Sequence, residues 1–252
     1  LLSLTPLLLA HAGGFPVKIG GLYMGDFTGY ADLALSAYFM AGGAFLFLYM
    51  KEGIRAHLVL ASLMFAISAW TKNEGITFAG FSFLLTIVFL IVERLKARDI
   101  IYFLIPLFVF VLPWTVYKSA HGLTSEEVGN LSLSVFAGNL GRLTVIIPAA
   151  LKFMFTQVAL LNLAWWAYLA STLLNYRNTG AIRVLTLHAL LLLQLGVYIF
   201  VYIITPVDIN WHLQTSLDRL ILHLLPLGMF ITAVNFSMLL KNCAQQGSYE
   251  KA

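Results

Sequence analysis

Long apolar runs separated by short polar segments dominate the pattern of this chain. A helix that crosses a bilayer needs about 20 consecutive, mostly apolar residues. Seven whole or nearly whole runs of this kind are present, at 32–50, 57–71, 75–92, 100–117, 156–176, 184–205 and 219–240, and a partial run covers 1–12. The pattern predicts one membrane-spanning helix for each run.

The composition supports a lipid environment. Hydrophobic residues make up 60% and charged residues 10% of the chain, whereas a soluble domain carries about 25% charged residues. We therefore expect an all-α, polytopic transmembrane helix bundle with seven spans plus one partial span, forming a single domain over 1–252. Run 57–71 is short, so it must cross steeply or in thinned bilayer. The alternative is a re-entrant hairpin over 57–92.

The first run indicates how the chain begins. Leu1 already lies inside it, with no initiator Met and no basic segment before it, which disfavours a signal peptide. We interpret 1–12 as the end of a helix whose beginning is missing. The chain is therefore expected to be a C-terminal fragment of a longer protein.

The basic residues indicate the orientation, because cytoplasmic loops of membrane proteins carry an excess of Lys and Arg. Nine of the fifteen lie in alternate loops or the tail: Lys51, Arg55, Arg94, Lys96, Arg98, Arg177, Arg183, Lys241 and Lys251. We assign that face to the cytoplasm, in what we expect to be the plasma membrane of a prokaryote. Segments 13–31, 72–74, 118–155 and 206–218 then face outward, and 143–155 is a candidate for a helix lying flat at the interface.

Charge and cysteine content narrow the classes of function. The net charge of +4 comes from scattered loop residues, not from the continuous basic patch of a nucleic-acid-binding protein. Cys243 is the one cysteine, which excludes an internal disulfide or a Cys-based metal site. The six histidines show no HExxH spacing. The sequence predicts no cofactor and leaves a divalent metal open.

A first polar cluster, 25–32, lies at the outer mouth of a span. Asp26 and Asp32 flank Tyr30 in a glycine-rich segment, in which the backbone can approach a ligand closely. A carboxylate at a membrane boundary can orient a hydroxyl group or accept its proton. The alternative is that Asp32 is only the N-cap of the helix that follows.

A second cluster, 68–75, contains Lys72 and Glu74 between two apolar runs. An ammonium group there costs free energy unless it pairs or reaches water. At headgroup depth it is a suitable partner for a lipid phosphate. The alternative is a simple turn, with Lys72 extended toward the interface and Glu74 as its partner.

A third cluster, 205–219, is a short outward loop rich in hydrogen-bonding groups, among them His212, and it ends in Asp218-Arg219 at a helix entrance. The guanidinium of Arg219 offers two parallel donors to a phosphate. The alternative makes Asp218 an N-cap and lets Arg219 reach lipid headgroups. His188 and His223 lie in apolar runs, and we interpret them as packed against backbone or Ser and Thr partners.

The predicted topology places all three clusters on the outward side. Acids, a lysine, an arginine and a histidine beside lipid form a set suited to binding an anionic amphiphile and activating a hydroxyl group.

At these residues the sequence resembles the polytopic GT-C class glycosyltransferases of the protein-mannosyltransferase-like type. The matching segments are Thr5-Pro6, then GYADL at 29–33, WTKNEG at 70–75, and TSLDRL at 215–220 followed by Pro226. They occur in the expected order and span most of the chain.

The resemblance implies an enzyme that moves a sugar from a polyprenyl-phosphate donor to a lipid, glycan or protein hydroxyl on the outer face, usually with inversion. It implies that the main catalytic Asp precedes this chain, so the chain by itself would lack the principal base. Asp32 matches an acid that shapes the sugar and acceptor site, and Lys72 and Arg219 match residues that bind the donor phosphate. Further substrate-binding candidates are Asp26, Tyr30, Glu74, His212 and Asp218.

Two other classes of function remain open. A transporter or lipid flippase would show broken helices near the midplane and inverted repeats, and the sequence shows neither. A non-catalytic membrane subunit would need no clustered acids and cations on one face. The charges at the ends of the spans therefore favour the glycosyltransferase.

Overall fold

A computed structural model describes residues 17–19, 22–24, 31–93, 96, 98–123, 132–156, 159–176 and 181–249. Each of the seven long runs is a helix. They are α2 (Asp32–Glu52), α3 (Arg55–Thr71), α4 (Asn73–Val92), α5 (Asp99–Ala120), α9 (Ala159–Leu174), α11 (Ile182–Ile204) and α12 (Ile209–Tyr249). The all-α prediction is confirmed for these segments. Two antiparallel strands of three residues each, β1 (Val17–Ile19) and β2 (Leu22–Met24), precede them, and run 1–12 lies outside the described residues.

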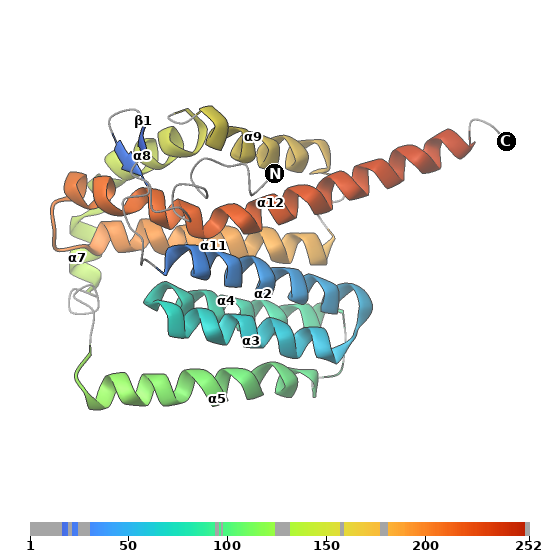
Figure 1. Cartoon of the computed structure of the whole chain (residues 1–252), viewed down its shortest axis with the longest axis horizontal. Helices are drawn as coiled ribbons and strands as arrows, with labels where there is room; N and C mark the ends of the chain where they lie inside the picture. Colours follow the sequence, from blue (N-terminus) through green and yellow to red (C-terminus); the bar gives the residue numbers. More distant parts are fainter. Residues whose placement is uncertain are drawn as a thin grey trace.

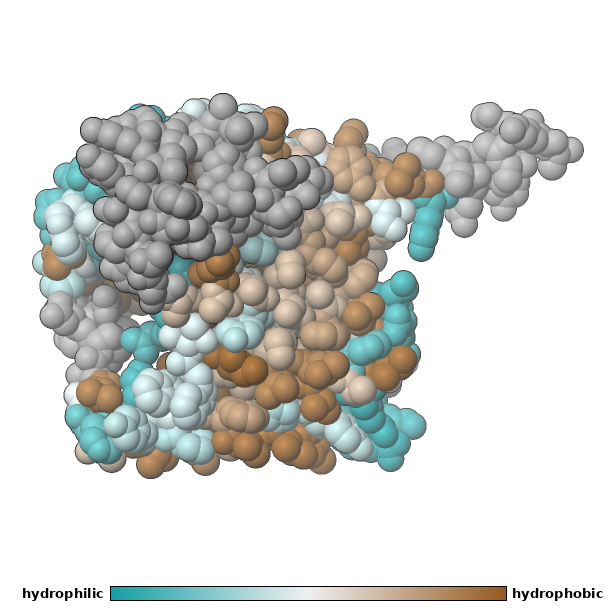
Figure 2. All heavy atoms as spheres, viewed as in Figure 1, coloured by the Kyte–Doolittle hydropathy of each residue, from teal (hydrophilic) through white to brown (hydrophobic). Residues whose placement is uncertain are grey.

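Five helices are long and apolar enough to cross a membrane: α2, α4, α5, α11 and the 209–242 part of α12. The chain is therefore an integral, multi-pass membrane protein. The α3 helix is a shorter apolar helix of 17 residues, and the count of seven spans stays a prediction. On the face seen in Figure 2, hydrophilic side chains gather at the two ends of the bundle and mainly hydrophobic ones lie between them.

The long helices lie roughly parallel or antiparallel to one another (Figure 1). The α2 helix packs against α3 and α12, α3 also packs against α4 and α5, and α11 packs between α4 and α12. Figure 1 shows α3 running along α2 from one end of the bundle to the other. Because α3 is shorter than the five candidate spans, the re-entrant hairpin over 57–92 stays an alternative prediction. Aromatic rings fill the α2–α3–α4 contact, where Phe39 and Phe78 stack with centroids 3.7 Å apart.

The junction between α3 and α4 is a very short turn. Lys72 is the single residue between the two helices and has an extended backbone, with φ −155° and ψ 160°. A Cβ atom on Gly75 would lie 2.0 Å from the carbonyl oxygen of Ser68. Only glycine lets the first turn of α4 approach the last turn of α3 so closely. This contact fixes the backbone of Lys72 at the end of the bundle.

The third polar cluster is helical, which corrects the predicted loop 206–218. The α12 helix begins at Ile209, and its first turn is capped by Asp208, whose Oδ1 accepts a hydrogen bond of 2.9 Å from the backbone N–H of Trp211. Asp208 therefore has the capping role that we assigned to Asp218. Arg219 lies in the third turn of α12 instead of at its entrance.

Local hydrogen bonds explain why these polar residues extend the helix. The hydroxyls of Thr215 and Ser216 donate to the carbonyl oxygens of Trp211 and His212, four residues earlier, at 3.0 and 2.7 Å. Each hydroxyl thereby finds its partner within the helix. A pattern based on apolar residues alone therefore begins the helix one polar segment too late, at 219 instead of Ile209.

The segment between α5 and α9 is also mostly helical. It contains α7 (Leu133–Gly138), the short 3₁₀ helix η2 (Leu140–Arg142) and α8 (Leu143–Phe155). The helix expected over 143–155 is confirmed, and its flat position at the interface stays a prediction. Arg142 donates to the carbonyl oxygen of Thr205 at 2.8 Å, and Asn139 donates to that of Ile203 at 3.0 Å. These bonds satisfy carbonyl groups at the C-terminus of α11.

The Gly75 contact predicts a strong effect of one methyl group. Gly75→Ala should lower the stability of the detergent-solubilised protein by about 2 kcal/mol, because the methyl group overlaps backbone that cannot move aside. Gly80→Ala is the matched control on the same helix, since its added Cβ has no atom within 4 Å. Gly80→Ala should be neutral or slightly stabilising. Thermal unfolding followed by circular dichroism measures both, and equal melting temperatures would contradict the interpretation.

The arrangement of the helix ends predicts which residues lie on which side of the membrane. Glu52 ends α2 and Ala120 ends α5, both are exposed, and they lie at opposite ends of the bundle. In a Cys243→Ser background, Glu52→Cys and Ala120→Cys should react with a membrane-impermeant maleimide from opposite sides, with Ala120→Cys labelled from outside. Labelling of both from one side would refute the proposed topology.

Candidate functional site

Predicted site residues from the second and third clusters lie around one cavity of about 730 Å³, which we call the charged cavity. Its polar wall comes from the start of α4, the end of α5, the C-terminal half of α11 and the first turns of α12. The polar lining residues are Lys72, Asn73, Glu74, Thr77, Lys118, Tyr198, His212, Ser216 and Arg219. Side chains such as Ile76, Phe200 and Leu220 form the apolar part. Lys72, Glu74, His212 and Arg219 thus share one site.

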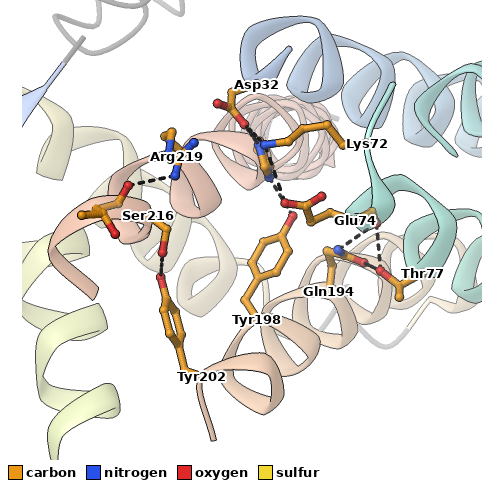
Figure 3. A network of polar contacts seen from close by, with 11 residues as sticks. Asp32, Lys72, Glu74, Thr77, Gln194, Tyr198, Tyr202, Ser216 and Arg219 are labelled. Carbon is orange, nitrogen blue, oxygen red and sulfur yellow. Dashed lines mark hydrogen bonds and ion pairs between the residues drawn. The ribbon is translucent and has the colours of Figure 1, made fainter. Parts of the chain in front are cut away.

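Asp32 lies behind this cavity, fully buried. It is the first residue of α2, whose N-cap is Ala31, and it makes no side-chain capping bond. Its Oδ1 lies 2.5 Å from Nζ of Lys72 and 2.7 Å from Nε2 of His223. The interpretation of Asp32 as only an N-cap is therefore wrong. The residue joins α2 to the α3–α4 junction and to α12 (Figure 3).

His223 is the functional candidate that the sequence interpretation missed. Besides Asp32 it contacts the hydroxyl of Tyr198, 3.0 Å from its Nδ1, instead of the backbone or Ser and Thr partners that we expected. A signal was present, because His223 follows Arg219 by four residues and so lies on the same helix face one turn deeper. An ionisable residue inside a membrane-spanning helix is by default a functional candidate.

Lys72 is shared between two carboxylates. Its Nζ lies 3.7 Å from Oε1 of Glu74, and both side chains are about a quarter exposed, at 22% and 27%. The backbone carbonyl of Glu74 accepts a bond of 3.2 Å from Nε2 of Gln194, and the hydroxyl of Thr77 donates to Oε1 of Gln194 at 3.1 Å. These bonds fix the first turn of α4 against α11. Lys72 can therefore present its charge to the cavity from a rigid support.

Arg219 reaches the cavity from α12. Its Nη2 donates to the carbonyl oxygen of Thr215 in the same helix at 2.9 Å, and Figure 3 shows its side chain on the Asp32 side of Ser216. One turn earlier, Ser216 shares a hydrogen bond of 2.8 Å with Tyr202, and the His212 and Tyr202 rings form a T-shaped pair with centroids 4.8 Å apart. Asp218 is half-buried on the same helix and is not among the cavity-lining residues.

Lys118 is a third cation of the cavity, one that the sequence analysis did not single out. It lies in the last turn of α5, and its Nζ donates to Oδ1 of Asn73 at 2.6 Å. The signal in the sequence was a lysine directly after the apolar run 100–117. The described lining residues include three cationic side chains, of Lys72, Lys118 and Arg219, and one carboxylate, that of Glu74. The wall is therefore net cationic and suits an anionic ligand.

An apolar groove of about 310 Å³ adjoins the charged cavity, between α4 and α5. Its lining includes Ala79, Gly80 and Phe83 from α4 and Leu104, Phe108 and Val111 from α5. Ile76 lines both the groove and the charged cavity. The α5 helix is the least buried of the five candidate spans. The α4/α5 groove and the charged cavity are thus neighbours that share Ile76 as a wall residue.

Two predicted site residues, Asp26 and Tyr30, lie outside the described residues. The chain matches no family model, no curated protein and no solved structure. The resemblance to GT-C glycosyltransferases accordingly rests on the short sequence motifs.

The buried ion pair predicts a large and coupled stability effect. Asp32→Asn should destabilise the detergent-solubilised protein by about 3 kcal/mol, because it leaves the Lys72 ammonium without its closest counter-charge. Lys72→Met should cost a similar amount, and the double variant should cost less than the sum of the two. Chemical unfolding of the four proteins measures this coupling.

Glu74→Gln is the control for this cycle, because the longer and partly exposed contact of Glu74 with Lys72 should contribute less than about 1 kcal/mol. An Asp32→Asn variant as stable as Glu74→Gln would contradict the assigned importance of the buried pair.

Proposed function

We propose that this protein is a membrane glycosyltransferase that takes a sugar from a polyprenyl-phosphate donor. The observation that carries the proposal is the junction of a cationic cavity and an apolar groove at Ile76. A polyprenyl-phosphate sugar has the same two parts, an anionic head and a long apolar chain. The acceptor is a hydroxyl group of a lipid, a glycan or a protein, on the outer face of a prokaryotic plasma membrane.

The cations support the chemistry of such a donor. When the bond between the sugar and the phosphate breaks, negative charge grows on the phosphate oxygen. Fixed cations in a water-poor site stabilise that charge by several kcal/mol. Lys72 supplies a compact charge and Arg219 a planar fork that can bind two phosphate oxygens. Lys118 adds a third positive charge at the α5 side of the cavity.

The groove supports the apolar part of the donor. Each methylene group moved from water into an apolar site contributes about 0.8 kcal/mol. For a chain that already lies in lipid the gain is smaller, so we assign the groove to placing the donor, with the charged cavity holding its phosphate. The outer face of α5 is exposed and apolar, with Ile105, Phe108 and Val109 each more than half exposed. A donor can therefore approach the groove from within the bilayer.

Asp32 takes a different role from the one that its motif implies. Its buried carboxylate does not line the charged cavity, so we assign it to positioning Lys72 through their 2.5 Å contact. Glu74 and His212 line the cavity and remain candidates for contact with the sugar or acceptor.

No described feature favours transport. Alternating access commonly uses helices that are broken near the midplane. The described parts of α4, α11 and α12 are continuous helices, and the cavity cations come from one end of the bundle.

Donor binding tests the proposal directly. In lipid nanodiscs, the intact protein should bind fluorescent undecaprenyl phosphate, and Lys72→Ala should weaken that binding at least tenfold. Arg219→Lys should also weaken it severalfold, because a point charge cannot reproduce the bidentate fork. Lys152→Ala is the matched control, since Lys152 is exposed on α8 and outside the cavity lining.

The measurement is an equilibrium titration at two salt concentrations, in which cation-dependent binding weakens as salt rises. Binding that is equal in wild type, Lys72→Ala and Arg219→Lys would overturn the assignment of the phosphate site.

A further inference from the structure

We infer that Tyr198 is a catalytic residue that takes the proton of the acceptor hydroxyl, with His223 and Asp32 behind it as a proton relay. The inference rests on the proposed glycosyl transfer for its substrate. It goes beyond that function because it assigns the proton transfer to a tyrosine inside the bundle. It also departs from the family resemblance, which implies that the principal base precedes this chain. We call the three residues the Tyr198–His223–Asp32 relay.

The hydrogen-bond geometry sets the direction in which a proton moves along the relay. Tyr198 lines the charged cavity, and its hydroxyl lies 3.0 Å from Nδ1 of His223. On the other side of the ring, Nε2 lies 2.7 Å from Oδ1 of Asp32. A carboxylate only accepts hydrogen bonds, so Nε2 carries the ring proton when His223 is neutral. Its Nδ1 lone pair is then left to accept the proton of the Tyr198 hydroxyl.

All three relay residues are buried from water. Asp32 and His223 are fully buried and Tyr198 is 3% exposed. Water has little access to the two contacts, so each group depends on its neighbour for hydrogen bonding. The rings of Phe39 and His223 form a T-shaped pair with centroids 6.1 Å apart, so that an apolar ring also covers the imidazole. Of the three relay residues, Tyr198 is the one that lines the charged cavity.

The proposed step is balanced in atoms and charge. The acceptor oxygen forms a bond to the anomeric carbon of the sugar as the bond from that carbon to the phosphate oxygen breaks. The acceptor proton passes to the Tyr198 oxygen while the Tyr198 proton passes to Nδ1 of His223. The resulting imidazolium is stabilised by the Asp32 carboxylate, as in other base–orienter pairs. The phosphate leaves with the bonding electron pair.

Lys72 links the two halves of this reaction. It contacts the same carboxylate oxygen of Asp32 as His223 does. Negative charge grows on the phosphate at Lys72 while positive charge grows on His223. Asp32 stands between the two cations. One buried carboxylate thus positions both His223, which receives the proton, and Lys72, which stabilises the charge on the leaving phosphate.

Tyr202 offers a matched control. It lies one turn further along α11, is equally buried, and its hydroxyl shares a bond with Ser216 instead of a base. Tyr202→Phe removes the same atom as Tyr198→Phe from the same helix. A purely structural role of buried tyrosines predicts the same result for both variants, whereas the relay predicts an effect of Tyr198→Phe alone.

The first experiment does not depend on glycosyl transfer. Methanesulfonyl fluoride should sulfonylate Tyr198, because His223 takes the phenolic proton as the oxygen attacks sulfur and fluoride leaves. Peptide mass spectrometry should show at least tenfold less labelling at this site in a folded His223→Gln protein and none at Tyr202. Absence of labelling at Tyr198, or labelling unchanged in His223→Gln, overturns the relay whatever the protein transfers.

The second experiment measures turnover of undecaprenyl-phosphate-mannose with an alkyl mannoside as acceptor. Tyr198→Phe should lower turnover by at least about 100-fold, the usual contribution of general base catalysis, with undecaprenyl phosphate binding within twofold of wild type. His223→Gln combined with Tyr198→Phe should lose little more, because the two act as one unit. Tyr202→Phe should retain wild-type turnover.

The two experiments separate the two hypotheses. Labelling of Tyr198 that depends on His223, in a protein that neither binds undecaprenyl phosphate nor turns over the donor, overturns the proposed function and supports the relay as an activated tyrosine. Turnover that survives Tyr198→Phe supports the function and overturns the relay.

Discussion

The buried carboxylate of Asp32 is the interaction on which the functional end of this bundle depends. Removing a charge from water costs several kcal/mol, and the cost is recovered only when counter-charges and hydrogen bonds are well placed. Here the partners are Lys72 at 2.5 Å and His223 at 2.7 Å, from two other parts of the chain. The start of α2, the α3–α4 junction and the middle of α12 must therefore keep their relative positions.

Several features of the fold serve that requirement. Gly75 allows the α3–α4 junction to close, so that Lys72 alone joins two helices. Gln194 fixes the first turn of α4 to α11 through the carbonyl of Glu74. At the other end of the bundle, Arg55 of α3 pairs with Asp99 of α5 at 2.8 Å, and Tyr49 of α2 donates to the same carboxylate. The two ends of the α2–α3 pair are thus each held by one carboxylate.

The same packing leaves room for a ligand on one side. The α5 helix contacts mainly α3, with Ser62 and Trp70 donating to the carbonyl oxygens of Phe103 and Phe110. It packs much less against α4, and the apolar groove lies between these two helices. Rigid ion-paired elements on one side and a lightly packed helix on the other form a site with a fixed polar head and an accessible apolar flank.

The sequence by itself determined the helices, because a bilayer about 30 Å thick requires long apolar runs and helical backbone. The alternation of loops also indicated that Lys72 and Arg219 belong to one end of the bundle, and both line one cavity. The start of α12 at Ile209 follows from local hydrogen bonds that the apolar pattern does not register. The tertiary structure alone decided that Asp32 is buried instead of capping. It also decided that His223 and Tyr198 meet. Periodicity shows which residues share a helix but not which neighbour each face meets, and a buried polar group takes its role from that neighbour.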